Sequence, residues 1–62
     1  RNQVLMDYIN VKDYLGRQYR EQHKDYARAL DCYLKIVDAI GDNINTQKQF
    51  YLAMAADTLY FD

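Results

Sequence analysis

The chain lacks most of the residues that interrupt or cross-link small proteins. Its 62 residues include no proline and no tryptophan, only two glycines, one cysteine (Cys32) and one histidine (His23). A single cysteine excludes an internal disulfide, and one cysteine with one histidine cannot form a zinc site unless carboxylates or a second chain contribute. We therefore expect no metal and no cofactor, and a small fold that depends on packing or association for its stability.

The chain also lacks a charge excess and a long apolar run. Eight basic and nine acidic side chains leave a formal net charge of -1, which argues against nucleic acid as the partner. No apolar run approaches the roughly 18 residues that a membrane-spanning helix needs, so we expect no membrane span. A lone thiol fits a reducing compartment, and we expect the protein in the cytoplasm, with the nucleus as the other possibility.

What the chain has instead is apolar periodicity of the helical kind. In the segment 25–40, large apolar residues recur every three or four positions, with Ala29 and Ile36 on the same face: Tyr26, Leu30, Tyr33, Val37 and Ile40. Asp25 is a suitable N-cap, and Gly41 follows the last periodic residue, where helices commonly end. This pattern predicts an amphipathic helix over 25–40.

A first helix is predicted over 2–22, before a turn at His23–Asp25. Its apolar stripe consists of Val4, Leu5, Tyr8, Val11, Leu15 and Tyr19. We expect Tyr8 and Tyr19 in the core, whereas Tyr14 lies off the stripe and is a candidate for a partner-facing residue. Gly16 either breaks this helix or lets a neighbouring helix approach closely.

A third helix is predicted over 46–60. It follows a polar loop at 42–45 and begins with Thr46-Gln47-Lys48-Gln49, which matches a capping box. Its apolar residues surround most of the helix axis, so we expect burial on more than one side and contact with something outside the chain. The fold class is therefore all-α, an antiparallel helical hairpin plus a third helix, forming one module over residues 1–62.

Two short motifs in the first two helices resemble the tetratricopeptide repeat. Leu15-Gly16 followed by Tyr19 resembles its first helix, and Tyr26, Ala29 and Tyr33 resemble its second. The resemblance covers about residues 12–41, and it implies a hairpin whose small residues, Gly16 and Ala29, allow close helix approach. It departs from the family at Lys12, where a bulky aromatic is frequent, and at Gly41, where proline is typical. A repeat cannot bury its faces alone, so the chain could be a segment of a longer array.

The same central run is also similar to the second helix of microtubule-interacting-and-trafficking (MIT) domains. These are three-helix bundles that carry a Tyr-x-x-Ala-Leu-x-x-Tyr run, which residues 26–33 reproduce. This resemblance implies a self-standing trafficking-type domain that binds a short helical motif. The Leu15-Gly16 pair fits the repeat family better, and the third helix lacks the charged pattern usual in MIT domains.

The sequence gives less support to a catalytic site or to an anion-binding site than to a helical interaction module. His23 beside Asp25 has no nucleophile at a suitable spacing, and the acidic residues show no metal-loop pattern, so we do not expect an enzyme. Four basic residues with interleaved aromatics could bind an anionic ligand or nucleic acid: Arg17, Arg20, Lys24 and Arg28. Glu21 and Asp25 are close enough to neutralise much of this basic stripe, as on an ordinary solvated face.

We therefore predict a protein–protein interaction module, a scaffold or adaptor that binds a partner segment in an interhelical groove. Self-association or contact with neighbouring repeats is a further possibility. The repeat resemblance implies that the first helix faces a bound peptide through Lys12, Tyr14, Arg17 and Arg20. The predicted apolar contacts of the third helix are Phe50, Met54, Leu59 and Phe61.

Overall fold

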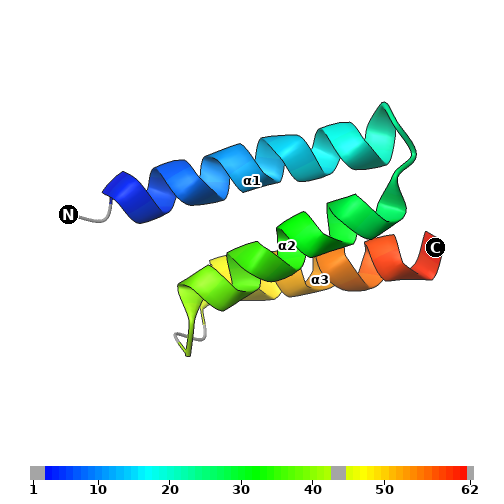
Figure 1. The fold of residues 1–62 in the computed structure, drawn as a ribbon. Helices are drawn as coiled ribbons and strands as arrows, with labels where there is room; N and C mark the ends of the chain where they lie inside the picture. Colours follow the sequence, from blue (N-terminus) through cyan, green and yellow to red (C-terminus); the bar gives the residue numbers. More distant parts are fainter. Residues whose placement is uncertain (1–2, 43–44, 62) are drawn as a thin grey trace.

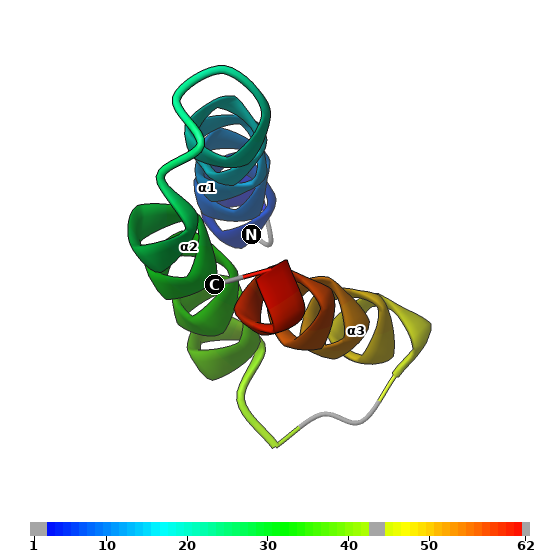
Figure 2. The same cartoon turned by 90° about the vertical axis from the view of Figure 1, so that its right-hand side faces the viewer.

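Three helices make up the fold, as predicted. The computed structural model describes residues 3–42 and 45–61, with the helices α1 (Gln3–Glu21), α2 (Tyr26–Ile40) and α3 (Thr46–Phe61). Along the chain α1 runs antiparallel to α2, and α2 antiparallel to α3 (Figure 1). Both outer helices pack on α2, which therefore lies at the centre of the bundle (Figure 2). The all-α class is confirmed, and each helix begins and ends within one residue of its predicted bounds.

The ends of α2 follow the predicted capping residues. The Asp25 side chain accepts a hydrogen bond of 3.2 Å from the Arg28 amide. Gly41 ends the helix with φ +76° and ψ −143°, a conformation that is almost restricted to glycine. The turn before α2 holds a feature that the sequence did not predict, because Lys24 adopts a left-handed φ of +54° that costs an L-residue energy.

The predicted capping box of α3 is wrong by one residue. Asn45, not Thr46, is the N-cap, since its side-chain oxygen accepts a 2.8 Å hydrogen bond from the Lys48 amide. Asparagine caps at least as well as threonine, so Thr46 becomes the first residue of the helix rather than its cap. The Lys48 ammonium group donates to the Gly41 carbonyl and so joins the two ends of the loop. Residues 43–44 of this loop lie outside the described residues.

The core centres on α2. Ala29, Tyr33 and Ile36 are fully buried and meet Ile9 from α1 and Tyr51 and Ala55 from α3. The predicted apolar face of the central helix is thus confirmed. Cys32 is also buried, because α2 is covered on two sides. Five partly buried residues surround this core: Tyr19, Leu30, Val37, Ile40 and Met54.

Gly16 marks the closest approach between α1 and α2. A Cβ atom at this position would lie 2.9 Å from Cε1 of Tyr33 and 3.3 Å from Cβ of Cys32. The first distance is shorter than real carbon–carbon contacts, so the Tyr33 ring occupies the space that any side chain at residue 16 would need. The helix continues through Gly16, and the prediction of close helix approach is confirmed.

The predicted core stripe of α1 is correct only in part: Tyr19 packs against the core, as expected, but the first half of the stripe does not. Val4 is 79% exposed, Val11 is 55% exposed and Tyr8, expected in the core, is 39% exposed. Ile9 and Gly16 point inward instead; they are seven residues apart and therefore share one face of the helix. The physical reason is the Tyr33 ring, which needs a residue without a side chain opposite it and so sets the rotation of α1.

The third helix also differs from expectation. Its described side chains are buried along one face only, at Tyr51, Ala55 and Thr58, whereas burial on more than one side was expected. The Thr58 hydroxyl is satisfied within the helix by the Met54 carbonyl at 2.8 Å. Large apolar side chains therefore remain exposed on α3: Phe50, Leu52, Leu59 and Tyr60.

Candidate interaction surface on α1 and α3

Two side-chain bonds connect α1 directly to α3. The Tyr51 hydroxyl donates to Oδ2 of Asp13 at 2.9 Å, and Nη2 of Arg20 donates to Oδ2 of Asp57 at 2.6 Å. Asp13 also accepts from Nε of Arg17 at 2.6 Å. These bonds hold the outer helices in register with each other, and we call the surface around them the α1–α3 face.

Tyr51 is the buried centre of this face. Burial of the side chain raises the pKa of Tyr51 to about 12, and the hydrogen bond to Asp13 adds to the effect. The hydroxyl therefore keeps its proton and remains a donor at neutral pH. It ties an aromatic ring of α3 to a carboxylate of α1, so the position of the ring is restricted by packing and by a hydrogen bond.

The hydroxyl of Tyr33 is a second buried hydroxyl close to Asp13 and Arg17. Among the described residues this buried hydroxyl has no partner at hydrogen-bonding geometry. Burial raises the pKa of Tyr33, while the positive charge of Arg17 acts in the opposite direction. Arg20 lowers the pKa of Tyr33 as well, through its charge and as a hydrogen-bond donor close to the hydroxyl.

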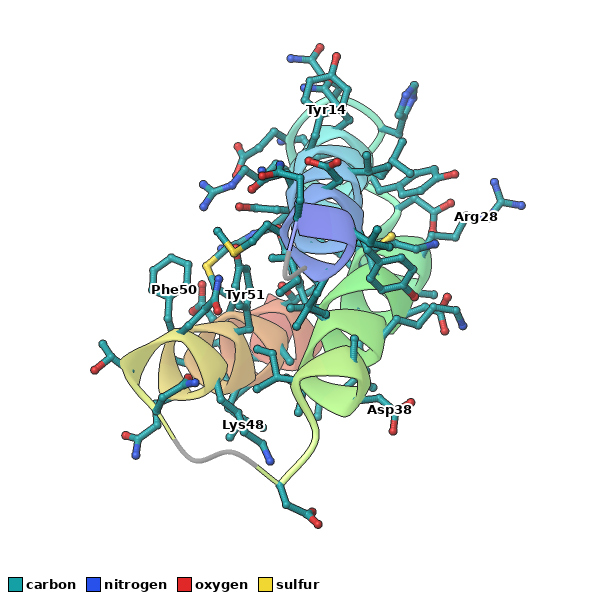
Figure 3. The ribbon with its side chains drawn as sticks, turned by 90° about the vertical axis from the view of Figure 1, so that its left-hand side faces the viewer. Tyr14, Arg28, Asp38, Lys48, Phe50 and Tyr51 are labelled. Carbon is teal, nitrogen blue, oxygen red and sulfur yellow. The ribbon has the colours of Figure 1, made fainter. Side chains whose placement is uncertain are left out.

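Phe50 and Met54 supply the apolar part of the face. The Phe50 ring packs edge-on against Tyr51, with centroids 5.1 Å apart and an interplanar angle of 82°, yet Phe50 is 49% exposed. Met54 is one turn further along α3 on the same side and packs partly against the core. Figure 3 shows Tyr51 pointing from α3 toward α1, with Phe50 beside it at the edge.

The other two predicted apolar contacts of α3 do not join this face. Leu59 is 58% exposed, but it follows Phe50 by nine residues, about two and a half helical turns, and so lies on the opposite side of α3. The side chain of Phe61 lies outside the described part of the chain. Phe50 and Met54 are therefore the two predicted residues that the structure brings together.

Three of the four predicted residues of α1 divide between two sides of the helix. Arg17 and Arg20 lie on the side of α3, as their carboxylate contacts show. Nζ of Lys12 instead lies 5.7 Å from the Tyr8 ring centroid. Burial raises the pKa of Cys32, and the charge of nearby Lys12 acts against it, which places Lys12 toward α2.

Tyr14 belongs to neither group. Its side chain is exposed and points away from the other two helices (Figure 3). The exposure expected for a residue off the apolar stripe is confirmed. A single concave surface containing all four α1 residues is not what the structure shows, because the rotation of α1 places them around more than half of the helix.

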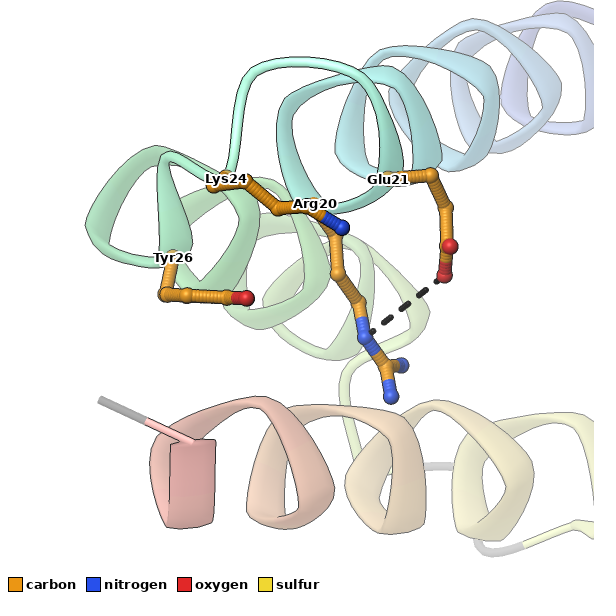
Figure 4. Close-up of a pocket in the computed structure, with 4 residues that line it drawn as sticks. All are labelled: Arg20, Glu21, Lys24 and Tyr26. Atoms are coloured by element: carbon orange, nitrogen blue, oxygen red, sulfur yellow. Dashed lines mark ion pairs between the residues drawn. The ribbon is translucent and has the colours of Figure 1, made fainter.

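The basic stripe lies at the α1–α2 turn, beside a pocket of about 270 Å³. Arg20, Glu21, Lys24 and Tyr26 line this pocket (Figure 4). Nε of Arg20 is 3.9 Å from Oε2 of Glu21, and Nε of Arg28 is 3.5 Å from Oδ2 of Asp25. The expected neutralisation by Glu21 and Asp25 is confirmed, with Asp13 and Asp57 as further acidic partners for Arg17 and Arg20.

Sequence reasoning missed the two carboxylates that organise the face. Asp13 and Asp57 bond residues on another helix, 38 and 37 positions away along the chain. No local sequence pattern signals pairs this far apart. The spacing of these acidic residues along the chain excludes a metal-binding loop but says nothing of their partners on another helix. Within the described ranges no cluster of three or more His, Cys, Asp or Glu side chains could hold a metal ion.

Comparisons with known proteins add no family to this description. No protein-family model, curated protein or solved structure matches the chain. Among the helices described here, none is long and apolar enough to cross a membrane.

Proposed function

We propose that the chain is a protein-interaction module, of the scaffold or adaptor kind, that binds an extended or helical segment of a partner protein along the α1–α3 face. Phe50 and Met54 provide the apolar contacts, and Arg17 and Arg20 lie at the edge. The observation that carries the proposal is the Phe50 ring, which is positioned by Tyr51 but still 49% exposed. A large aromatic in a fixed position at the surface is typical of the residues that dominate binding energy.

The face is organised before any partner arrives. Phe50 rests on Tyr51, and Tyr51 is bonded to Asp13, so little side-chain entropy remains to be lost on binding. Arg17 bonds Asp13 through Nε, and its side chain is 50% exposed. A guanidinium has five N–H donors, so Arg17 keeps donors for a carboxylate or backbone carbonyl of the partner at the edge of the apolar contact.

Both resemblances point to this class of function. In the tetratricopeptide-like interpretation, α1 and α3 are the first helices of successive repeats, and the face between them binds a peptide. In the MIT-like alternative, the bundle stands alone and binds a short helical motif. The lone cysteine supports a reducing compartment for such a module, the cytoplasm or the nucleus.

The pocket at the α1–α2 turn favours a second candidate, the binding of an anionic ligand by Arg20 and Lys24. The acidic neighbours weigh against it, because Glu21 lines the same pocket and Asp57 bonds Arg20. The two candidates differ in salt dependence. Affinity for an anion falls steeply as salt is added, whereas apolar contact at Phe50 is far less sensitive.

Selection of peptides from a displayed library against the immobilised chain tests the proposal. We expect the selected peptides to lose about tenfold or more in affinity when Phe50→Ala is introduced, since a truncated hot-spot aromatic costs about 2 kcal/mol or more and about 1.4 kcal/mol is tenfold. Leu59→Ala is the matched control, because Leu59 is similarly exposed on the opposite side of α3. Failure to select any peptide, or equal binding by the Phe50→Ala chain, contradicts the proposal. Steep salt dependence with indifference to Phe50→Ala favours the anionic ligand.

A further inference from the structure

A second apolar surface lies on α1 and belongs to neither the core nor the α1–α3 face. Val4, Tyr8 and Val11 are exposed and Leu15 is partly buried. These residues follow one another at intervals of four, three and four, which is the spacing of the a and d positions of a coiled coil. We call these four residues the α1 seam.

The α1 seam faces away from the rest of the bundle. Asp13 and Arg20 of α1 bond α3, and Ile9 and Gly16 face α2. Val11 is two residues from Asp13, about 200° around the helix, so the seam lies opposite α3. Figure 2 shows α2 and α3 both on one side of α1. The described chain leaves Val4, Tyr8 and Val11 exposed and covers Leu15 only in part.

The charges beside the seam complement a second copy of the same helix. With Tyr8 and Leu15 at a and Val4 and Val11 at d, Asp7 occupies a g position and Lys12 the next e position. In a parallel coiled coil these positions of the two helices face each other. Asp7 therefore faces Lys12 of the second copy, and symmetry forms the pair twice. An antiparallel pairing sets e against e and g against g, which brings like charges together.

Both charged side chains are available for this pairing. Within the described residues Asp7 makes no ion pair, and its Oδ1 accepts only a neutral hydrogen bond of 2.8 Å from Gln3. Lys12 makes no ion pair there either, and its ammonium group lies near the Tyr8 ring. The basic residues Arg17 and Arg20, by contrast, already have carboxylate partners.

We propose that the α1 seam is a homodimer interface in which two copies pack their α1 helices in parallel and in register. The two-fold axis runs along the helices, so each seam residue meets its own counterpart. The α1–α3 faces remain open on the outer sides of the dimer. A partner with two binding segments then gains avidity by engaging both copies. Dimerisation rests on the seam and its charges, and is independent of the function proposed for the α1–α3 face.

Sedimentation equilibrium of charge-reversed chains tests the proposal. We expect the unmodified chain to form dimers as its concentration rises from about 10 μM to about 1 mM. Asp7→Lys alone and Lys12→Glu alone each place like charges together in the homodimer and weaken it by about tenfold. An equimolar mixture of the two variants dimerises again, because the introduced lysine of one chain faces the introduced glutamate of the other. Asp38→Lys, an exposed charge reversal on α2, is the control and leaves dimerisation unchanged.

Disulfide trapping tests the parallel register. In a Cys32→Ala background, Val11→Cys places two thiols together at the two-fold axis, within the distance that a disulfide spans. We expect an interchain disulfide on mild oxidation, and none with Leu34→Cys, a similarly exposed position on α2. Three results overturn the proposal: a monomer throughout the concentration range, a dimer indifferent to both charge reversals, or no disulfide from Val11→Cys. A strict monomer assigns the α1 seam to another polypeptide instead.

Discussion

The two helix interfaces of α2 are built in different ways. Against α1, the contact depends on shape, because Gly16 leaves room for the Tyr33 ring and any added side chain would collide with it. Against α3, Tyr51 and Ala55 join the core around α2, and side-chain hydrogen bonds connect Tyr51 and Asp57 of α3 directly to α1. The hairpin of α1 and α2 is thus fitted by packing, whereas α3 is positioned by packing together with hydrogen bonds.

This difference explains where the exposed apolar surface lies. A close, shape-dependent contact has a single rotation of α1 that satisfies it, and that rotation turns Val4 and Val11 outward. The α3 helix buries one face and is apolar around most of its axis, so Phe50 and Leu59 are left outside. Each outer helix therefore contributes an apolar surface for a different reason. Substitutions at the α1–α2 contact should change stability through packing, whereas those between α1 and α3 should change it through hydrogen bonds.

The largest expected effect comes from Gly16→Ala. On an exposed helix this change stabilises by about 0.5–1 kcal/mol, but here the added Cβ would lie 2.9 Å from the Tyr33 ring. We expect a net loss of about 1–3 kcal/mol in the free energy of unfolding, as overpacking typically costs. Urea unfolding followed by circular dichroism measures it.

Whether Gly16→Ala lowers or raises the free energy of unfolding shows how closely α1 and α2 pack. Tyr33→Leu removes the ring that the added Cβ would meet. In the Tyr33→Leu chain, Gly16→Ala should therefore cost less stability than it costs in the unmodified chain. A stabilised Gly16→Ala chain would show that helix propensity dominates and that the α1–α2 contact is looser than described.

An effect of similar size is expected at the polar connection between α1 and α3. Tyr51→Phe removes the hydrogen bond to Asp13 and should cost about 1.5–3 kcal/mol, because the acceptor is charged. Thermal unfolding at neutral pH measures the loss. Phe50→Tyr, a change of one hydroxyl on the exposed neighbouring ring, is the control, and we expect it to be close to neutral.

The same bond predicts a pH dependence. Burial and Asp13 raise the pKa of Tyr51 from 10.0 to about 12, so between these values the unfolded chain loses the proton first. The associated stability is complete below pH 10 and is lost as the pH rises toward about 12. The Tyr51→Phe chain should lose less stability over this window than the unmodified chain. Parallel losses in the two chains would contradict a buried, bonded Tyr51 hydroxyl.

The smallest expected effect lies in the turn that joins α1 to α2. Lys24 adopts φ +54°, so Lys24→Gly removes backbone strain and should raise the stability of the hairpin by about 0.5–1 kcal/mol. Gln22→Gly, in the same turn, relieves no positive φ and should be neutral or destabilising. Equal shifts in the melting temperatures of both variants would argue against strain at Lys24.

Local spacing was sufficient to predict much of the fold. The helix bounds, the Asp25 cap and the Gly41 end all depend on residues near one another along the chain, and a glycine inside a helical pattern was enough to predict a close approach at Gly16 as one of two alternatives. The cap of α3 was misplaced because Asn45 and Thr46 are adjacent capping residues, and asparagine is the stronger acceptor there.

The rotation of α1 and the composition of the α1–α3 face depend on distant residues. The stripe through Val4, Tyr8 and Val11 is more apolar than the line through Ile9 and Gly16, and pattern alone therefore favoured it. The Tyr33 ring instead fixes the rotation of α1 by packing on Gly16. These two residues are on different helices, and the periodicity within one helix carries no information about such a contact. The pairing of Asp13 with Tyr51 and of Arg20 with Asp57 is equally long-range, so the site could be predicted only in part.

The rotation of α1 underlies both proposed surfaces, and a nuclear Overhauser spectrum of the isotope-labelled chain measures it most directly. We predict strong contacts between the Gly16 Hα protons and the Tyr33 ring, and none between the Val11 methyl groups and Ile36. Val11 contacts with Ile36, together with no Gly16–Tyr33 contact, would place the apolar stripe of α1 in the core and contradict the account.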